Sequence, residues 1–184
     1  MTTLLKITIK PGEFWDVGLN SFVSVKEHTI LLEHSLRSIS KWESKNKIPF
    51  LDHQMTYQEI LDYIRCMTIT QNVNPLSYQL ITKDQIEGIQ AYIDMPMTAT
   101  TVKGFKHQGY VPKKEIVTNE LIYYWMIVCG IPFECEKWNF NRLMTLIEVC
   151  FAKNAPAKKM SRGEVFSQNK ALNAARRAKM GSKG

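Results

Sequence analysis

The sequence predicts a mostly α-helical α+β fold, with a small N-terminal β-hairpin or sheet, a helical bundle-like body and a basic C-terminal helix. Two periodicities and one charge asymmetry support this prediction. The first ten residues alternate apolar and polar side chains, whereas later segments repeat apolar residues every three or four positions. Residues 153–184 hold nine Lys or Arg against Glu164 alone, while residues 1–152 hold 15 basic and 16 acidic residues. We therefore expect a near-neutral globular body over 1–152 and a cationic tail over 153–184.

Residues 1–34 are predicted to be β-rich. Leu5, Ile7 and Ile9 alternate with polar residues, which is typical of a half-buried strand ended by Pro11–Gly12. The run 21–33 supplies further β-forming residues, so about three short strands are expected. The period then changes to four and three positions, which predicts helical structure over 35–152 and an apolar stripe of Leu32, Leu36, Ile39 and Trp42.

Two helices with capping signals follow. Thr56 and Glu59 have capping-box spacing before a stripe made of Ile60, Leu61, Ile64 and Met67. Thr82 or Asp84 is expected to cap a second helix over 82–94 that turns Ile86, Ile89 and Ile93 inward. Residues 95–114 contain two Pro, two Gly and several Thr, which predicts a long loop.

The segment 118–130 is apolar on nearly every side and is predicted to be the central, most buried helix, ended by Gly130 and Pro132. Its aromatic run, Tyr123–Trp125, is interpreted as core packing rather than a surface for base stacking. A second helix over 135–154 is expected to pack against it as an antiparallel partner. The expected apolar stripe of that second helix is Trp138, Leu143, Leu146, Val149 and Cys150.

The sequence contains no phosphate-binding glycine loop, nucleophile elbow or metal-ligand spacing. The four cysteines stand in apolar surroundings and are interpreted as free structural thiols. His34 lies between Glu33 and Ser35, but adjacency in sequence does not establish a catalytic geometry. We therefore expect no enzyme activity, cofactor, metal or small-molecule substrate. No apolar run approaches the roughly 18–20 residues that span a bilayer.

The basic tail carries another capping box, Ser161 with Glu164, which predicts a helix over about 161–180. Its few large apolar residues cannot form a core of their own. Three interpretations stay open: nucleic-acid binding, docking on a partner chain, and a solvated end. The candidate partner-binding residues are Lys158, Lys159, Phe166, Leu172, Arg176, Arg177 and Lys179.

Several segments together resemble proteins of long-tailed bacteriophages, and specifically the tail assembly chaperones encoded between the tail tube and tape measure proteins. The segments are "LEHSLRSISKWESKNKIPFL", "LDYIRCMTITQNV", "MPMTATT", "LIYYWMIVCGIPFECEKWNFNRLMTLIEVC" and the terminal "KKMS…ALNAARR". They extend from about residue 29 to the end of the chain.

The resemblance implies a non-enzymatic protein that binds the tape measure protein, or another phage tail protein, in the host cell cytoplasm during virion morphogenesis. Such families often make a longer form by ribosomal frameshifting. Self-association is a further expectation. The alternatives are a nucleic-acid-contacting virion or packaging protein and a structural tail or neck component. A strongly basic tail is not required by the chaperone role.

Overall fold

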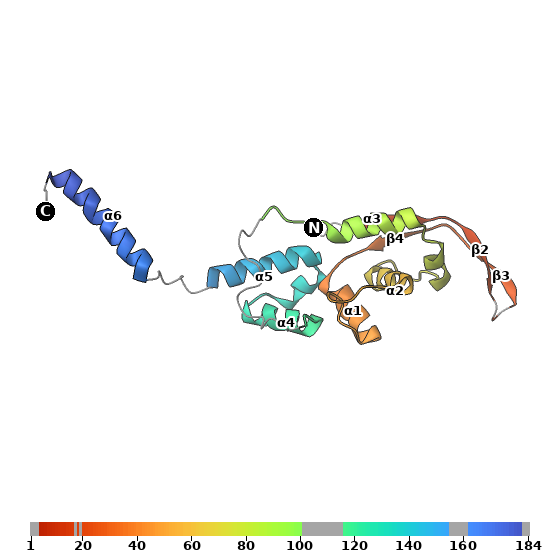
Figure 1. The fold of residues 1–184 in the computed structure, drawn as a ribbon. Coiled ribbons are helices and arrows are strands. Elements are labelled where there is room, and N and C mark those ends of the chain that lie inside the picture. The colour runs from red at the N-terminus through yellow and green to blue at the C-terminus, as the bar shows by residue number, and fades with distance from the viewer. Residues whose placement is uncertain (1–3, 17, 19, 101–115, 155–161, 182–184) are drawn as a thin grey trace. The chain divides into compact units, whose positions relative to one another are not determined.

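A computed structural model describes residues 4–16, 18, 20–100, 116–154 and 162–181 (Figure 1). The chain divides into two compact units, Met1–Lys153 and Asn154–Gly184, which are described separately below. The first unit has a small β region followed by helices, and the second contains a basic helix. The predicted α+β, mostly α fold class is confirmed.

The β region has four strands in two antiparallel pairs. β1 (Leu5–Ile9) pairs with β4 (His28–Leu32), and β2 (Gly12–Asp16) pairs with β3 (Ser21–Val25). The sequence predicted about three strands, and the structure has four. Lys10 and Pro11 separate β1 from β2, and Gly12 already pairs with Val25 of β3, so the predicted stop at Pro11–Gly12 does not end the β structure.

α1 (Leu36–Asn46) begins at Ser35, whose hydroxyl accepts the backbone N–H of Ser38. The hydroxyl of Ser38 in turn accepts the N–H of Ser35, which closes a capping box that places the junction between strand and helix. Leu32 therefore belongs to β4, not to the helical stripe. Leu36, Ile39 and Trp42 are buried as predicted.

α2 (Tyr57–Met67) and α3 (Lys83–Asp94) begin with the two capping boxes expected from the sequence. Thr56 pairs with Glu59, and Thr82, not Asp84, caps α3 together with Gln85. α2 buries Leu61, Ile64 and Met67. α3 buries Ile89 and Tyr92, whereas the predicted inward residues Ile86 and Ile93 are only half-buried. A 3₁₀ helix, η1 (Pro75–Leu80), connects the two.

Residues 95–100 form neither helix nor strand, and the rest of the predicted loop lies outside the described residues. α4 (Asn119–Val128) ends at Gly130, whose φ of 65° lies in the left-handed region. The N–H of Ile131 donates a hydrogen bond to the Met126 carbonyl at 2.8 Å. This bond closes the C-terminal turn of α4 at Gly130, where the sequence predicted the helix to end.

The segment 133–154 contains two helices instead of the single one expected. η2 (Phe133–Lys137) is a 3₁₀ turn, and α5 (Phe140–Asn154) begins after Asn139, whose side-chain oxygen accepts the N–H groups of Asn141 and Arg142. Trp138 therefore precedes α5. The buried residues of α5 are Phe140, Leu143 and Ile147, whereas Leu146, Val149 and Cys150, which were predicted to be buried, are half-buried.

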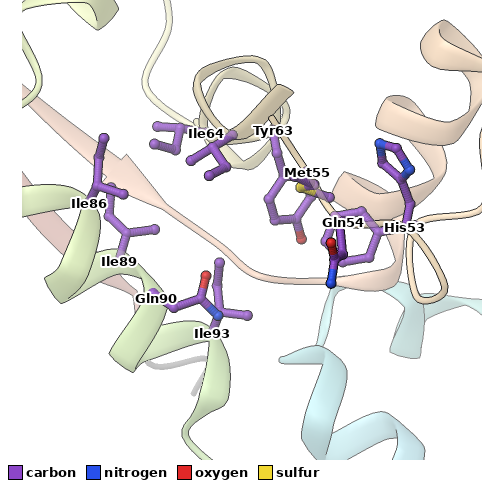
Figure 2. Close-up of a pocket in the computed structure, with 11 residues that line it drawn as sticks. His53, Gln54, Met55, Tyr63, Ile64, Ile86, Ile89, Gln90 and Ile93 are labelled. Carbon is purple, nitrogen blue, oxygen red and sulfur yellow. The ribbon is translucent and has the colours of Figure 1, made fainter. Parts of the chain in front are cut away.

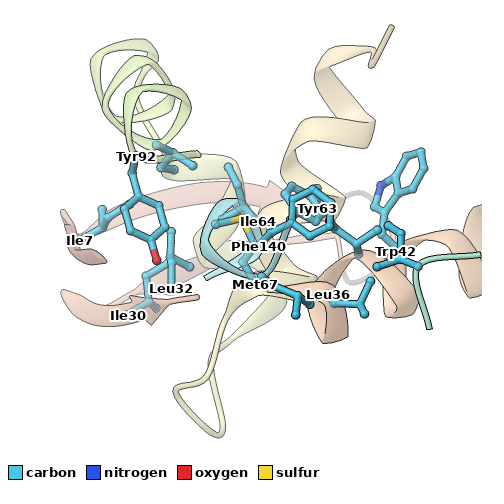
Figure 3. Packing of buried hydrophobic residues seen from close by; sticks show 14 of the residues in the cluster. Ile7, Ile30, Leu32, Leu36, Trp42, Tyr63, Ile64, Met67, Tyr92 and Phe140 are labelled. Carbon is cyan, nitrogen blue, oxygen red and sulfur yellow. The ribbon is translucent and has the colours of Figure 1, made fainter. Parts of the chain in front are cut away.

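The core of the first unit joins the β1–β4 pair to all of its described α-helices. Figure 3 shows the part of this core that β1, β4, α1, α2, α3 and the start of α5 contribute. The chain after α2 also pairs with β4, because the N–H of Ile69 donates to Leu31 and the N–H of Glu33 donates to Met67. The largest fully buried side chains are Ile9, Ile30, Leu32, Leu36, Ile39, Trp42, Ile64, Met67, Ile122, Met126, Leu143 and Ile147. This core holds α2, α3 and α4 in place while parts of their apolar faces stay exposed.

α6 (Arg162–Met180) lies in the second unit, close to the predicted 161–180. It is 19 residues long and has no buried side chain. Ser161, the predicted cap, lies outside the described residues.

Candidate protein-binding surfaces

α2 and α3 enclose an open, largely apolar pocket of about 510 Å³ (Figure 2). Isoleucines from both helices line it, and the segment before α2 adds Met55 and His53. The complete lining is Phe50, His53, Gln54, Met55, Ile60, Tyr63, Ile64, Ile86, Ile89, Gln90 and Ile93. Ile60, Ile86 and Ile93 are half-buried, so apolar surface remains in contact with water in the free chain. Such a pocket can accept apolar side chains of a partner.

His34 lies beside this pocket at the centre of a buried polar network. Its Nδ1 is 2.6 Å from the hydroxyl of Tyr63, and its backbone N–H donates to the hydroxyl of Tyr92 at 3.4 Å. Its carbonyl accepts the N–H of Phe140. One residue thus connects the end of β4 to α2, α3 and α5. The neighbouring Ser35 caps α1, so this arrangement joins helices and forms no catalytic triad.

Lowering the pH from 7 to 4 is expected to cost the body about 3 kcal/mol through His34. Burial lowers the pKa of His34 from 6.5 to about 4, partly opposed by nearby Asp94. The unfolded chain therefore binds the proton more tightly, and stability is lost as the pH falls from about 6.5 towards 4.

Urea titrations at each pH should show that wild type loses about 3 kcal/mol more than His34→Gln over this interval. The variant is the control because it removes the titrating imidazole while leaving every other ionisable group in place. Equal pH dependence in the two proteins would contradict the role of His34.

α4 presents a second apolar surface. Ile122, Trp125 and Met126 point into the core, but Tyr124, Ile127 and Val128 are 54–62% exposed. The prediction that this is the most buried helix is therefore wrong. The helix is apolar on nearly every side, yet within the described residues its neighbours leave Tyr124, Ile127 and Val128 exposed. The uncovered side of α4 is an exposed apolar surface of the kind that marks contact sites.

α6 supplies a third surface. On a helix of about 3.6 residues per turn, its four large apolar residues and five cations fall within about half of the circumference. That half carries Val165, Phe166, Leu172, Met180, Arg162, Lys170, Arg176, Arg177 and Lys179. Small residues dominate the other half, among them Ala171, Ala174 and Ala178. We call these the large face and the small face of α6.

Five of the seven candidate binding residues lie on the large face: Phe166, Leu172, Arg176, Arg177 and Lys179. Lys158 and Lys159 lie outside the described residues. Reasoning from sequence missed the pocket and the exposed side of α4, because both depend on which neighbours cover a helix. The all-round hydrophobicity of 118–130 was the available signal for α4.

Within the described parts of the chain, no three His, Cys, Asp or Glu side chains gather as a metal site would require. All four cysteines are free, and burial raises the pKa of Cys129 to about 11. Burial also raises the pKa values of Cys66 and Cys135, which lowers the fraction of reactive thiolate at neutral pH. Among the described helices, none has the length and apolar character needed to cross a bilayer.

Comparison with known proteins finds no matching family model, no matching curated protein and no matching solved structure.

Proposed function

We propose that this chain is a non-enzymatic tail assembly chaperone, which binds the tape measure protein in the host cytoplasm during phage tail morphogenesis. The observation that carries the proposal is α6, a helix of 19 residues without a single buried side chain. Phe166 and Met180 are 72% and 83% exposed. Ordering each residue costs about 1–2 kcal/mol of backbone entropy, so a helix that buries nothing gains its main stabilisation by docking.

The body supports the same function. The α2–α3 pocket and the exposed side of α4 keep apolar side chains in contact with water, and Met55 at the pocket can adapt to differently shaped clients. These surfaces suit the binding of apolar segments of another chain. The resemblance to tail assembly chaperones implies that this other chain is the tape measure protein.

Nucleic-acid contact is a second candidate, because five cations share one face of α6. The same face carries all four large apolar residues of the helix, and a phosphate backbone would leave them in water. This mixture favours a protein partner. A structural tail or neck component is the third candidate.

Replacing Phe166 and Leu172 by Glu is expected to weaken capture of the co-expressed tape measure protein by about tenfold or more, because both apolar contacts are lost. The matched control is Ala174→Glu/Ala178→Glu, which adds the same two charges on the small face and should preserve capture. Quantitative pull-down from cells that express both proteins makes the comparison. Equal capture by both variants would contradict docking through the large face.

The alternatives give different results. A nucleic-acid protein should shift DNA at about 0.15 M salt, with affinity falling steeply as salt rises. A structural component should be present in many copies in purified virions, whereas a chaperone should be absent from them.

A further inference from the structure

A basic cleft of about 670 Å³ lies between α1 and the segment α4–η2. Arg37, Lys41 and Lys45 line it from α1, and Lys137 lines it from η2. The three α1 cations are four residues apart, so they form one row along the helix. Ser40 and Ser44 line the same cleft. This concentration of charge stands out in a body whose basic and acidic residues nearly balance.

Most of these cations are available to a partner. Lys45 pairs with Asp62, and its side chain is still 60% exposed. Arg37, Lys41 and Lys137 are exposed, and none of them forms an ion pair within the described residues. Glu136 is the one acidic residue that lines the cleft, and its carboxylate accepts a hydrogen bond of 2.7 Å from the hydroxyl of Tyr123. The cleft therefore has more positive charge than its own carboxylates neutralise.

The cleft borders the exposed apolar side of α4. Tyr123 lines the cleft, and its ring centroid is 6.1 Å from that of Phe133, which is 56% exposed. Ile127 follows Tyr123 by four residues, one turn along the same side of α4, and is 62% exposed. A row of cations and an apolar strip thus lie next to each other on one surface of the body.

We propose that this surface binds an acidic amphipathic helix of a partner protein. Cations four residues apart on α1 are about 6 Å apart along its axis, and carboxylates four residues apart on a partner helix have the same spacing. The partner's carboxylates pair with Arg37, Lys41 and Lys137, while its apolar residues cover Phe133 and Ile127. This proposal rests on the proposed function, because it specifies the chemistry of a segment of the protein that the chaperone would bind.

The apolar strip decides between protein and nucleic acid. A phosphate backbone would satisfy the cations but would leave Phe133, Ile127 and Tyr124 exposed to water. A helix with acidic and apolar residues covers both parts at once, and its charges also set its orientation.

The test uses the full chain and a synthetic amphipathic peptide of about 20 residues, with Leu on one face and Glu at every fourth flanking position. Fluorescence anisotropy at about 0.15 M salt, where exposed charges are already partly screened, measures its affinity. We expect the Glu peptide to bind at least about tenfold more tightly than a Gln version. Arg37→Glu/Lys41→Glu should weaken it by a similar factor.

The matched control is Lys10→Glu/Lys26→Glu, which changes net charge equally at exposed positions of the β region and should leave affinity within about twofold. All variants retain α6, so unchanged binding by Arg37→Glu/Lys41→Glu would place the site elsewhere and overturn the proposal. The proposal would also be overturned if a single-stranded oligonucleotide bound more tightly than the Glu peptide and if that binding depended on Arg37 and Lys41.

Capture of the tape measure protein separates this inference from the proposed function. If wild type captures that protein but does not bind the Glu peptide, the chaperone proposal stands and the acidic-helix proposal fails. If wild type binds the Glu peptide through Arg37 and Lys41 but captures no tape measure protein, the chaperone proposal fails and the acidic-helix surface stands.

Discussion

Replacing Trp125 by Ala is expected to lower the free energy of unfolding by about 3–5 kcal/mol, as large-to-small changes in a core do. The Trp125 side chain is 7% exposed and lies edge-on to Phe151 of α5, with ring centroids 6.3 Å apart. Removing the indole would leave a cavity between α4 and α5 that the surrounding side chains fill only in part. A urea titration of the purified variant gives the change.

Tyr124→Ala is the matched control, because Tyr124 is the next residue of α4 and is 54% exposed. We expect a change within about 0.5 kcal/mol, which is usual for a surface substitution. A larger cost for Tyr124→Ala than for Trp125→Ala would contradict this prediction, because it would mean that α4 buries Tyr124 and exposes Trp125.

Glu43→Ala is expected to cost about 3–5 kcal/mol, since it removes a buried charged acceptor from its donors. Glu43 is 7% exposed, and its carboxylate accepts hydrogen bonds from the N–H of Phe50 at 2.8 Å and the N–H of Asn119 at 2.8 Å. It also accepts the side-chain amide of Asn119. Glu43 of α1 therefore caps the start of α4, where Thr118 makes no side-chain cap bond.

Thermal and urea unfolding of Glu43→Ala, Glu43→Gln and Glu120→Ala make the comparison. Gln keeps the shape and one acceptor oxygen, so we expect an intermediate loss. Glu120 is an exposed acid in the first turn of α4, and its removal should cost less than about 1 kcal/mol. A cost below about 1 kcal/mol for Glu43→Ala would mean that water replaces the carboxylate, and that α4 does not depend on the cap from α1.

These two substitutions bear on the proposed function because α4 carries exposed apolar residues, the proposed binding surface, on the side opposite its buried residues. Glu43 and Trp125 hold that helix from one end and one side. The exposed residues Tyr124 and Ile127 are then presented next to the basic cleft. Loss of either anchor should therefore weaken partner capture together with stability, whereas Arg37→Glu/Lys41→Glu should weaken binding alone.

Reasoning from sequence succeeded where the stabilising interaction is local. The capping boxes at Thr56 and Thr82 join residues three positions apart, so their residue types alone identify the helix starts. Gly130 ended α4 for a similar local reason, since its φ of 65° suits a residue without a side chain. The absence of a core for α6 followed from its composition, because few large apolar residues cannot bury a long helix.

Only the tertiary structure decided which side of each helix is covered. The sequence 118–130 is apolar on nearly every side, and the fold decides that Ile122, Trp125 and Met126 are buried, with Trp125 against Phe151 of α5. The cap of Glu43 on Asn119 joins residues 76 positions apart, and the basic cleft joins α1 to η2 over a similar distance. Periodicity reports the preference of a residue for burial, but burial itself depends on neighbours that are distant in the chain. For this reason the sequence determined most of the helices and the lack of buried residues in α6, whereas the pocket, the basic cleft and the exposed side of α4 arise only when the chain folds.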